Sequence, residues 1–283
     1  MPITKRSGGR IHEVYFTRDS GDQWSFKFSD DIHDIQGVLY EISESIANSP
    51  TRAERRLRSI IHRHPYAFDA YDQLAFIYDY GQRQPELVLN VLEAGLARAR
   101  ELFPEEFVLG EGRVPWSILE NRPFLRMYER MGLELSKLGK VDKARDVFKA
   151  LIGMNPEDNQ RVRELLCSCY FRLAEYSSVL ELCRMYDGDT MAAISFGRIL
   201  ALLKLGRRRN AKSALRTAAM WRPNIAQEIM ASRHRKPHDL SSPYELGSKR
   251  EAELFWNDFG DYWDEAAVSF VREEAGKGGS ISR

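Results

Sequence analysis

The sequence predicts an all-α protein, a right-handed solenoid of tetratricopeptide-type helical hairpins with a short N-terminal β-hairpin and a C-terminal capping helix. Small and large apolar residues recur with a period of about 34 residues. Proline follows each of the clearer units, and 43% of the residues are hydrophobic, enough for a continuous core. A single helical hairpin cannot bury its apolar face alone, so stacking of neighbouring hairpins should stabilise the chain.

The clearest repeat runs from Leu125 to Pro156. Gly132 and Ala144 are small where its two helices should cross closely, and Pro156 should end the second helix. Leu138-Gly139-Lys140 provides the turn between them. The same offsets recur downstream at Leu202, Leu205-Gly206-Arg207, Ala211, Leu215, Ala218 and Pro223.

Weaker units lie between these two repeats and upstream of them. Between them lies a degenerate repeat, with helices expected near Gln160 to Leu173 and Ser177 to Met185. Upstream, the second-helix pattern recurs at Ala53, Leu57, Ile60 and Pro65, and the first-helix pattern at Tyr71, Leu74, Ala75 and Tyr78. The run from Pro85 to Phe103 should be the partner helix, ending at Pro104.

An irregular insert interrupts the repeats at residues 104–121, where Gly and Pro are frequent. We expect Trp116 and Leu119 to anchor it to the helices. A loop of this length within a repeat array is typical of a functional insert or of a strap across the core.

The N-terminal segment alternates with period two in Ile11–Phe16 and Trp24–Phe28, around the turn residues Asp19 to Asp22. This pattern predicts a β-hairpin. Since an isolated hairpin is only marginally stable in water, it should lean on the first helices, residues 31–48, as an N-terminal cap.

After Pro223 the sequence passes through a polar linker and resumes as an amphipathic helix from Glu245 to Glu274. One face of that helix is aromatic, at Phe255, Trp256, Phe259, Tyr262, Trp263 and Phe270. The preferred interpretation is a cap over the last repeat. The alternative is an exposed interface for a partner or a second copy of the chain, formed by Trp256, Phe259 and Trp263.

The expected organisation follows from these breaks. It comprises a tail and hairpin at 1–30, a repeat solenoid at 31–231 with its insert at 104–121, a linker at 232–243, capping helices at 244–275 and a flexible tail at 276–283.

Composition limits the partners and the compartment. The net charge is +1 from 42 basic and 41 acidic residues, which argues against a strongly charged partner as the default. No stretch approaches the roughly 20 apolar residues that a membrane helix requires. The N-terminus lacks the apolar core of a secretory signal, and three cysteines are an odd number for a disulfide framework. We therefore expect a cytoplasmic protein without membrane partners.

Three sequence segments resemble a known family: Glu120–Arg126, Asn155–Arg163 and Tyr244–Ser248. Together they resemble bacterial tetratricopeptide-repeat proteins related to the suppressor-of-tumorigenicity-7 family, over roughly residues 50–270. The resemblance implies a helical scaffold without an established enzymatic activity. Arg161 stands where those relatives usually have glycine.

The sequence offers no catalytic, cofactor or metal site. His62 and His64 point to different faces of a helix, and His234 and His238 flank a Lys-Pro pair in the linker. Cys167 and Cys169 are also two positions apart, which prevents joint chelation on a helix. No nucleophile elbow or phosphate-binding glycine loop is present. We therefore predict a protein that is not an enzyme and needs no cofactor.

Two rival functions remain. Arginine clusters occur at residues 52–58, 207–209 and 233–236, and on a single surface they could neutralise nucleic-acid phosphates. An enzyme is the other rival, with a pocket of His or acidic residues near the insert at 104–121.

The favoured hypothesis is an adaptor that binds a peptide or protein segment in a concave groove lined by the first helices. Arg126 and Arg163 would supply charge-assisted hydrogen bonds, and aromatic side chains apolar contact. The alternative for Asn159 and Arg163 is a structural role in tying repeats together. By repeat register the groove should contain Asp72, Phe76, Arg126, Glu129, Gln160, Arg163, Tyr170 and Phe196.

Overall fold

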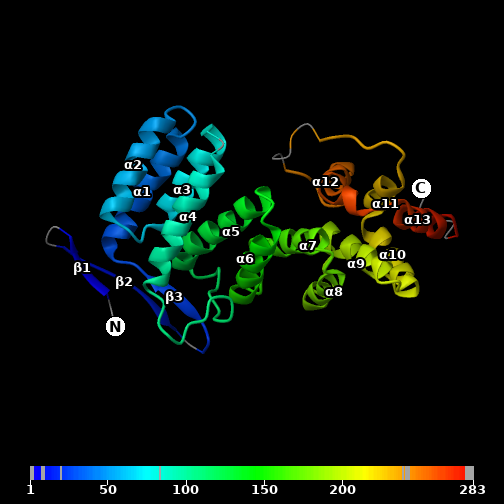
Figure 1. The fold of residues 1–283 in the computed structure, drawn as a ribbon, viewed down its shortest axis with the longest axis horizontal. Helices are drawn as coiled ribbons and strands as arrows, with labels where there is room; N and C mark the ends of the chain where they lie inside the picture. The colour runs from blue at the N-terminus through cyan, green and yellow to red at the C-terminus, as the bar shows by residue number, and fades with distance from the viewer. Residues whose placement is uncertain are drawn as a thin grey trace. The chain divides into compact units, whose positions relative to one another are not determined.

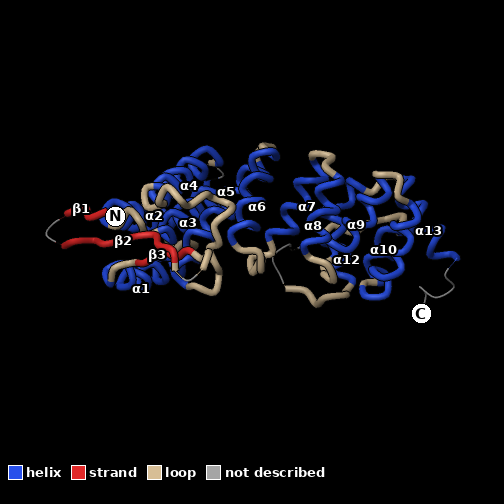
Figure 2. The backbone as a smooth tube through the Cα atoms, turned by 90° about the horizontal axis from the view of Figure 1, so that it is seen from below, coloured by secondary structure: helices blue, strands red, loops and turns tan. Residues whose placement is uncertain are grey.

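The computed structural model describes residues 3–7, 10–19, 21–82, 84–237, 239 and 243–277, and confirms the predicted fold class (Figure 1). Antiparallel helical hairpins follow a small antiparallel sheet, whose strands are confined to the N-terminal region in Figure 2. The chain divides into two compact units, Met1–Val162 and Arg163–Arg283. The solenoid expected at 31–231 therefore spans the division between these units.

In the described part of the first unit, three strands precede helices α1 to α6. Its elements are β1 (Ile3–Ser7), β2 (Arg10–Arg18), β3 (Trp24–Lys27), α1 (Asp30–Ser45), α2 (Pro50–Arg63), α3 (Phe68–Ile77), a π-helical continuation (Tyr78–Gln82), α4 (Pro85–Arg100), a 3-10 turn (Leu119–Asn121), α5 (Arg122–Lys137) and α6 (Val141–Met154).

Helix α7 (Val162–Arg172) begins at the division, and the remaining helices belong to the second unit. They are α8 (Tyr176–Met185), α9 (Ala192–Lys204), α10 (Arg208–Trp221), α11 (Pro223–Met230), α12 (Lys249–Phe259), a 3-10 turn (Gly260–Tyr262) and α13 (Glu265–Lys277).

Gly132 and Ala144 allow α5 and α6 to cross closely, as the sequence predicts. A Cβ on Gly132 would clash with the Phe148 ring, so α5 and α6 approach closely only because residue 132 lacks a side chain. Ala144 is fully buried at the same crossing.

Three of the hairpin turns, those of α5–α6, α7–α8 and α9–α10, share one backbone geometry. Gly139 and Gly206 have φ of +73° and +70°, and Ala174 takes the same place with φ of +55°. In each turn the next amide donates back to the helix, as Lys140 does to Leu135 at 2.9 Å and Glu175 to Tyr170 at 2.8 Å. The degenerate repeat thus keeps the turn while losing the glycine that favours it.

The predicted β-hairpin is confirmed, with β2 and β3 antiparallel and Phe16 opposite Phe26. Strand β1 was not predicted; it pairs with β2 on the other edge. The support expected from residues 31–48 stays a prediction. The aromatic contacts of the hairpin lie elsewhere in the first unit, since Phe16 contacts the rings of Phe103 and Phe107 at 4.9 and 4.7 Å, where α4 gives way to the insert.

Asn121 fastens this hairpin to the insert. Its fully buried amide accepts from the Phe26 N–H at 3.1 Å and donates to the carbonyls of Trp24 and Pro115, both at 3.1 Å. The Trp24 N–H donates to the Arg113 carbonyl at 2.7 Å, so backbone pairing continues from strand to insert. The hairpin is therefore attached to the insert through hydrogen bonds of strand β3.

The anchors of the insert differ in part from the prediction. Leu119 is 63% exposed, so its predicted role as an anchor is wrong, while Phe107 and Val114 are buried. The Val114 N–H donates to the Met154 carbonyl at 2.7 Å, which joins the insert to the end of α6. Trp116 is half-buried beneath the Arg122 guanidinium, 5.2 Å from the ring centroid, as an anchor should be.

The C-terminal helix is broken into α12 and α13, and its aromatic face is largely buried. Phe255 contacts Phe196 at 5.8 Å, and Phe259 contacts Phe171 at 6.3 Å, so the segment covers earlier helices of the second unit. The interface alternative is wrong for Phe259 and Trp263, because both are buried. Trp256 is half-buried and stacks on His234 at 3.8 Å.

Candidate functional site

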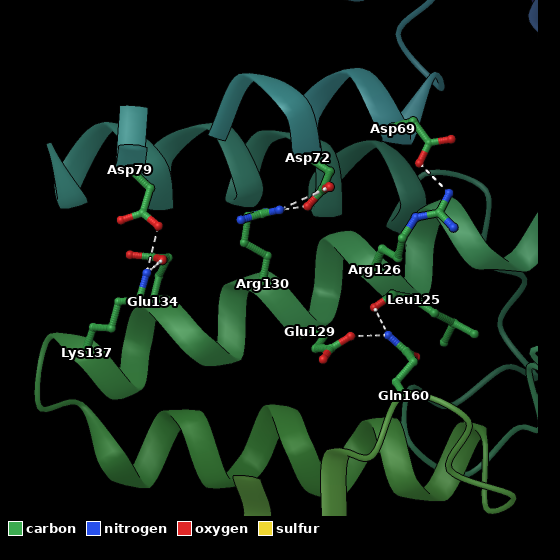
Figure 3. A network of polar contacts seen from close by, with 10 residues as sticks. All are labelled: Asp69, Asp72, Asp79, Leu125, Arg126, Glu129, Arg130, Glu134, Lys137 and Gln160. Atoms are coloured by element: carbon green, nitrogen blue, oxygen red, sulfur yellow. Dashed lines mark hydrogen bonds and ion pairs between the residues drawn. The ribbon is translucent and has the colours of Figure 1, made fainter. Parts of the chain in front are cut away.

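The candidate site lies where α3 and α5 run side by side in the first unit (Figure 3). Acidic side chains follow one edge of α3 and its continuation, and basic side chains follow the facing edge of α5. Each pair joins residues separated by 57 or 58 positions in the sequence. This constant offset means that the two helices run in parallel, as equivalent helices of successive repeats do.

Three ion pairs form this charge ladder. The Arg126 guanidinium lies 2.7 Å from the Asp69 carboxylate, and Lys137 lies 2.8 Å from Asp79. Arg130 reaches both oxygens of Asp72, at 2.5 and 3.4 Å. A two-pronged contact of this kind fixes the relative position of the two helices more firmly than a single bond.

Burial raises the pKa of two carboxyl groups at this site, Asp69 and Glu129. Loss of solvent raises the pKa of Asp69, against the opposing effect of Arg126. Burial also raises the pKa of Glu129 to about 6, and the hydrogen bond from Gln160 only partly offsets this. The Gln160 amide donates both to Glu129 and to the Leu125 carbonyl, the latter at 3.3 Å.

Exposed aromatic rings lie beside the ladder. Phe76 and Tyr80 stack with centroids 5.5 Å apart, and they remain 37% and 73% exposed. The Arg130 guanidinium lies 5.7 Å from the Phe76 centroid, which links the stack to the middle ion pair. We call the ladder, Glu129, Gln160 and this stack the α3–α5 face.

Five of the eight predicted groove residues meet on this face. They are Asp72, Phe76, Arg126, Glu129 and Gln160. Their partners Asp69, Asp79, Arg130, Lys137 and Tyr80 were not predicted. The signal that could have found them is the repeated acid-to-base offset, which becomes meaningful only once the helices are aligned.

The other three predicted residues lie elsewhere. Arg163 belongs to the second unit, where it pairs with Asp189 at 2.5 Å and lies 5.2 Å from the Tyr186 centroid. Phe196 is fully buried and Tyr170 nearly so, and the prediction that they line an exposed groove is wrong. Repeat register placed Tyr170 and Phe196 on first helices of their repeats, but it assigned them to an exposed face when their side chains are buried.

Metal groups, pockets and membrane spans can each be examined in the described part of the chain. Among the described residues, no group of three or more His, Cys, Asp or Glu side chains is placed to hold a metal ion. Two pockets of about 660 and 590 Å³ are lined within residues 180–222 and 58–98, so neither includes the insert proposed for an enzyme site. In the described part of the chain, no helix is long and apolar enough to cross a membrane.

Comparison with known families places residues 46–275, most of the chain, in a match to the family described as Transcriptional repressor TCF25. No curated protein matches the chain. The expected relationship to bacterial tetratricopeptide-repeat proteins of the suppressor-of-tumorigenicity-7 group is therefore wrong. The segments that suggested it lie at the starts of α5 and α12 and between α6 and α7, where the general preferences of helix ends govern the sequence.

Proposed function

Because the chain belongs to the transcriptional repressor TCF25 family, we propose that it acts in transcriptional repression as a non-catalytic scaffold. It binds a segment of another protein through the α3–α5 face. The observation that carries this proposal is the Phe76–Tyr80 stack, which remains exposed beside a row of charges that already have partners.

Exposed aromatic rings favour this function because such side chains dominate the binding energy of protein interfaces. Tyr80 offers a large apolar area and a hydroxyl group that can find a partner at the rim. The stack holds Tyr80 in one orientation before binding, which reduces the ordering entropy lost on association.

The charge ladder supports the same conclusion. Arg126 is still 41% exposed while paired with Asp69, so its remaining N–H groups can donate to a partner. Because the ladder is preformed, its side chains lose less freedom on binding than unpaired surface arginines would.

A tethered-reporter assay tests the proposal. The chain is fused to an unrelated DNA-binding domain, and expression of a reporter gene carrying the matching site is measured. The wild-type fusion should lower expression, and Tyr80→Ala should restore most of it. Loss of an exposed aromatic contact typically weakens an interface by about 1–3 kcal/mol, enough to lower occupancy several-fold or more.

Tyr40→Ala is the matched control, since Tyr40 is a similarly exposed tyrosine on α1. It should repress like wild type, and all fusions are compared at equal expression. No repression by wild type would contradict the role in transcription. Equal repression by wild type and Tyr80→Ala would instead contradict the α3–α5 face.

Nucleic-acid binding is the second candidate, favoured by the family description and by exposed arginines on α2. Arg52, Arg55 and Arg58 are exposed there, although Arg58 pairs with Glu54 at 3.0 Å and Arg56 with Glu41 at 3.5 Å. Half of this cluster is thus neutralised. Direct binding would require affinity for a labelled oligonucleotide that falls steeply with salt and with Arg52→Ala/Arg55→Ala.

The same proposal bears on the compartment. A role in repression requires the protein to reach the sites of transcription, rather than to stay in the cytoplasm as its composition suggested. Imaging of the tagged chain in its own cells gives the distribution. A tagged protein that never co-localises with chromosomal DNA would contradict a direct role in repression.

A further inference from the structure

The second unit contains a pocket of about 660 Å³ between α8, α9 and α10. Its apolar lining includes Leu180, Ile194 and Leu202, with hydroxyl and amide groups from Thr190, Ser195, Asn210, Ser213 and Thr217. Such a mixture of apolar surface and directed polar groups is typical of binding pockets.

The lining carries more positive than negative charge. Four arginines contribute, Arg184, Arg198, Arg207 and Arg222, against the two acids Asp187 and Asp189. Asp189 is occupied, because it pairs with Arg163 at 2.5 Å and accepts from the Met191 N–H at 2.8 Å. Arg222 is correspondingly engaged with Glu251 at 3.4 Å.

The three remaining arginines keep donor capacity toward the pocket. Arg198 lies 3.6 Å from Asp187, and Arg184 lies 3.9 Å from Glu181, both contacts being exposed. Exposed pairs at such distances contribute little, so a ligand carboxylate can replace them at low cost. Arg207 is exposed on the pocket lining and has no ion pair among the residues that the structure describes.

The rim adds an exposed aromatic side chain. Trp221 lines the pocket and is 59% exposed at the end of α10, next to Met220, which is 70% exposed. Tryptophan is a strong anchor at interfaces, and methionine adapts to side chains of different shape. A ligand for this site should therefore carry apolar groups as well as negative charge.

We propose that this pocket binds an acidic peptide segment of another protein. Carboxylates of the segment pair with Arg184, Arg198 and Arg207, and a neighbouring apolar side chain packs on Trp221. This interaction is independent of the α3–α5 face, because all the residues that carry it lie within 180–222.

Charge favours a peptide over a nucleic acid. Asp187 is exposed at the pocket and would repel the continuous row of phosphates on a nucleic-acid strand. A flexible peptide can direct its carboxylates to the arginines and keep them away from Asp187. The lining also offers one exposed tryptophan rather than the series of aromatic platforms on which successive bases stack.

Fluorescence anisotropy tests the proposal with a labelled peptide in which Asp and Glu alternate with Leu and Phe. The wild-type chain should bind this peptide, and Arg198→Ala/Arg207→Ala should weaken binding at least about tenfold, since truncating charge partners has large effects. Arg209→Ala/Arg216→Ala removes the same charge from exposed positions of α10 outside the pocket, and it should bind like wild type. Circular dichroism verifies that both variants are folded.

Two further probes separate the alternatives. The same peptide with Asn and Gln in place of its acids should bind at least about tenfold more weakly, because it lacks the charges that the arginines recognise. Tyr80→Ala, which tests the α3–α5 face, should leave peptide binding unchanged, so the two proposals can fail separately.

Equal effects of the pocket and control variants would overturn the assignment of this site. So would equal binding of the acidic and neutral peptides, or failure of the acidic peptide to bind. Tighter binding of a single-stranded oligonucleotide, with the same sensitivity to Arg198→Ala/Arg207→Ala, would overturn the peptide in favour of nucleic acid.

Discussion

At the scale of the single residue, Ala174 occupies a turn position that glycine holds in the two neighbouring hairpins. Its φ of +55° lies in the left-handed region, where a Cβ costs about 1–2 kcal/mol. The flexibility of glycine in the unfolded chain offsets about 0.4–1 kcal/mol of this. Ala174→Gly should therefore raise the free energy of unfolding by about 0.5 kcal/mol, as measured by urea denaturation.

Gly139→Ala is the reciprocal control, because it places a Cβ at φ of +73° with open space around it. This variant should destabilise the protein through backbone strain alone. Destabilisation by Ala174→Gly would contradict the interpretation of residue 174 as a repeat turn under strain.

Glu129 should make stability depend on pH. Burial raises its pKa to about 6 in the folded protein, above the ordinary value, so folding favours the protonated form. Stability from this group is full below about pH 4.5 and is lost as pH rises through about 6. Glu129→Gln keeps an acceptor for Gln160 and should stabilise the protein by about 1–2 kcal/mol at pH 7.5.

The gain should shrink toward zero near pH 4.5, which urea denaturation at both pH values can measure. Glu93→Gln serves as the matched control, because it removes the same charge from an exposed position of α4, and it should change stability by less than about 0.5 kcal/mol. An equal effect of Glu129→Gln at both pH values would show that its proton is not linked to folding.

At the scale of the element, Asn121 holds β3 against the insert through three buried hydrogen bonds. Asn121→Ala leaves the Phe26 N–H and the carbonyls of Trp24 and Pro115 without their partner. Unsatisfied buried groups cost about 1–3 kcal/mol each before relaxation, so we expect a loss of about 2–3 kcal/mol. Urea denaturation gives the total, and hydrogen exchange at Phe26 reports the local opening.

Asn257→Ala is the control, because Asn257 is exposed on α12 and, among the described residues, its side chain hydrogen-bonds only to its neighbour Asp258. It should change stability by less than about 0.5 kcal/mol. Protection at Phe26 that survives Asn121→Ala would mean that other contacts hold the hairpin on the insert.

Periodicity predicted the elements well where the period was complete. The helices of the repeats, the β2–β3 hairpin and the burial of the C-terminal aromatic face all follow from local patterns. Strand β1 was missed because Ile3-Thr4-Lys5-Arg6-Ser7 lacks apolar alternation. Helix α11 was missed because Pro223 was interpreted as a stop, whereas it is the first residue of a new helix, a position that suits proline.

The candidate site was only half predictable for a different reason. Register identified the helices of the α3–α5 face and five of its residues, but ion pairs between residues 57 or 58 positions apart have no local signature. The same reasoning misplaced Phe196, since a helix in the middle of a repeat array contacts neighbours on several sides. Burial on those sides is a tertiary property.

At the scale of the whole molecule, the cysteines are confined to the second of the two units, so their reactivity measures the folding of that unit. Cys167, Cys169 and Cys183, the chain's three cysteines, are all buried in the second unit. Burial also raises the pKa of the Cys183 thiol to about 12 and that of Cys167 well above its ordinary value. Because the thiolate is the reactive form, a thiol reagent at pH 8 should label the native protein slowly.

All three thiols should react promptly in denaturant, and the absorbance of the released product measures both rates. Gln227→Cys, at an exposed position of α11, gives the rate of an accessible thiol for comparison. Native labelling as fast as at residue 227 would contradict the burial of the cysteines. Slow labelling provides a natural probe for unfolding of residues 163–283 without any added group.

The charge ladder also has a consequence for errors in folding. Its rungs are unevenly spaced, since the step from the second pair to the third is roughly twice the step from the first to the second. If α5 slid one helical turn along α3, Arg130 could meet Asp69, but Glu134 would approach Asp72. Lys137 would lose Asp79 and keep only Glu134 of its own helix, which lies 2.6 Å away. Only the observed alignment of α3 and α5 gives all three basic side chains a carboxylate on the facing helix, so a shift of one helical turn between the two repeats would break ion pairs and bring like charges together.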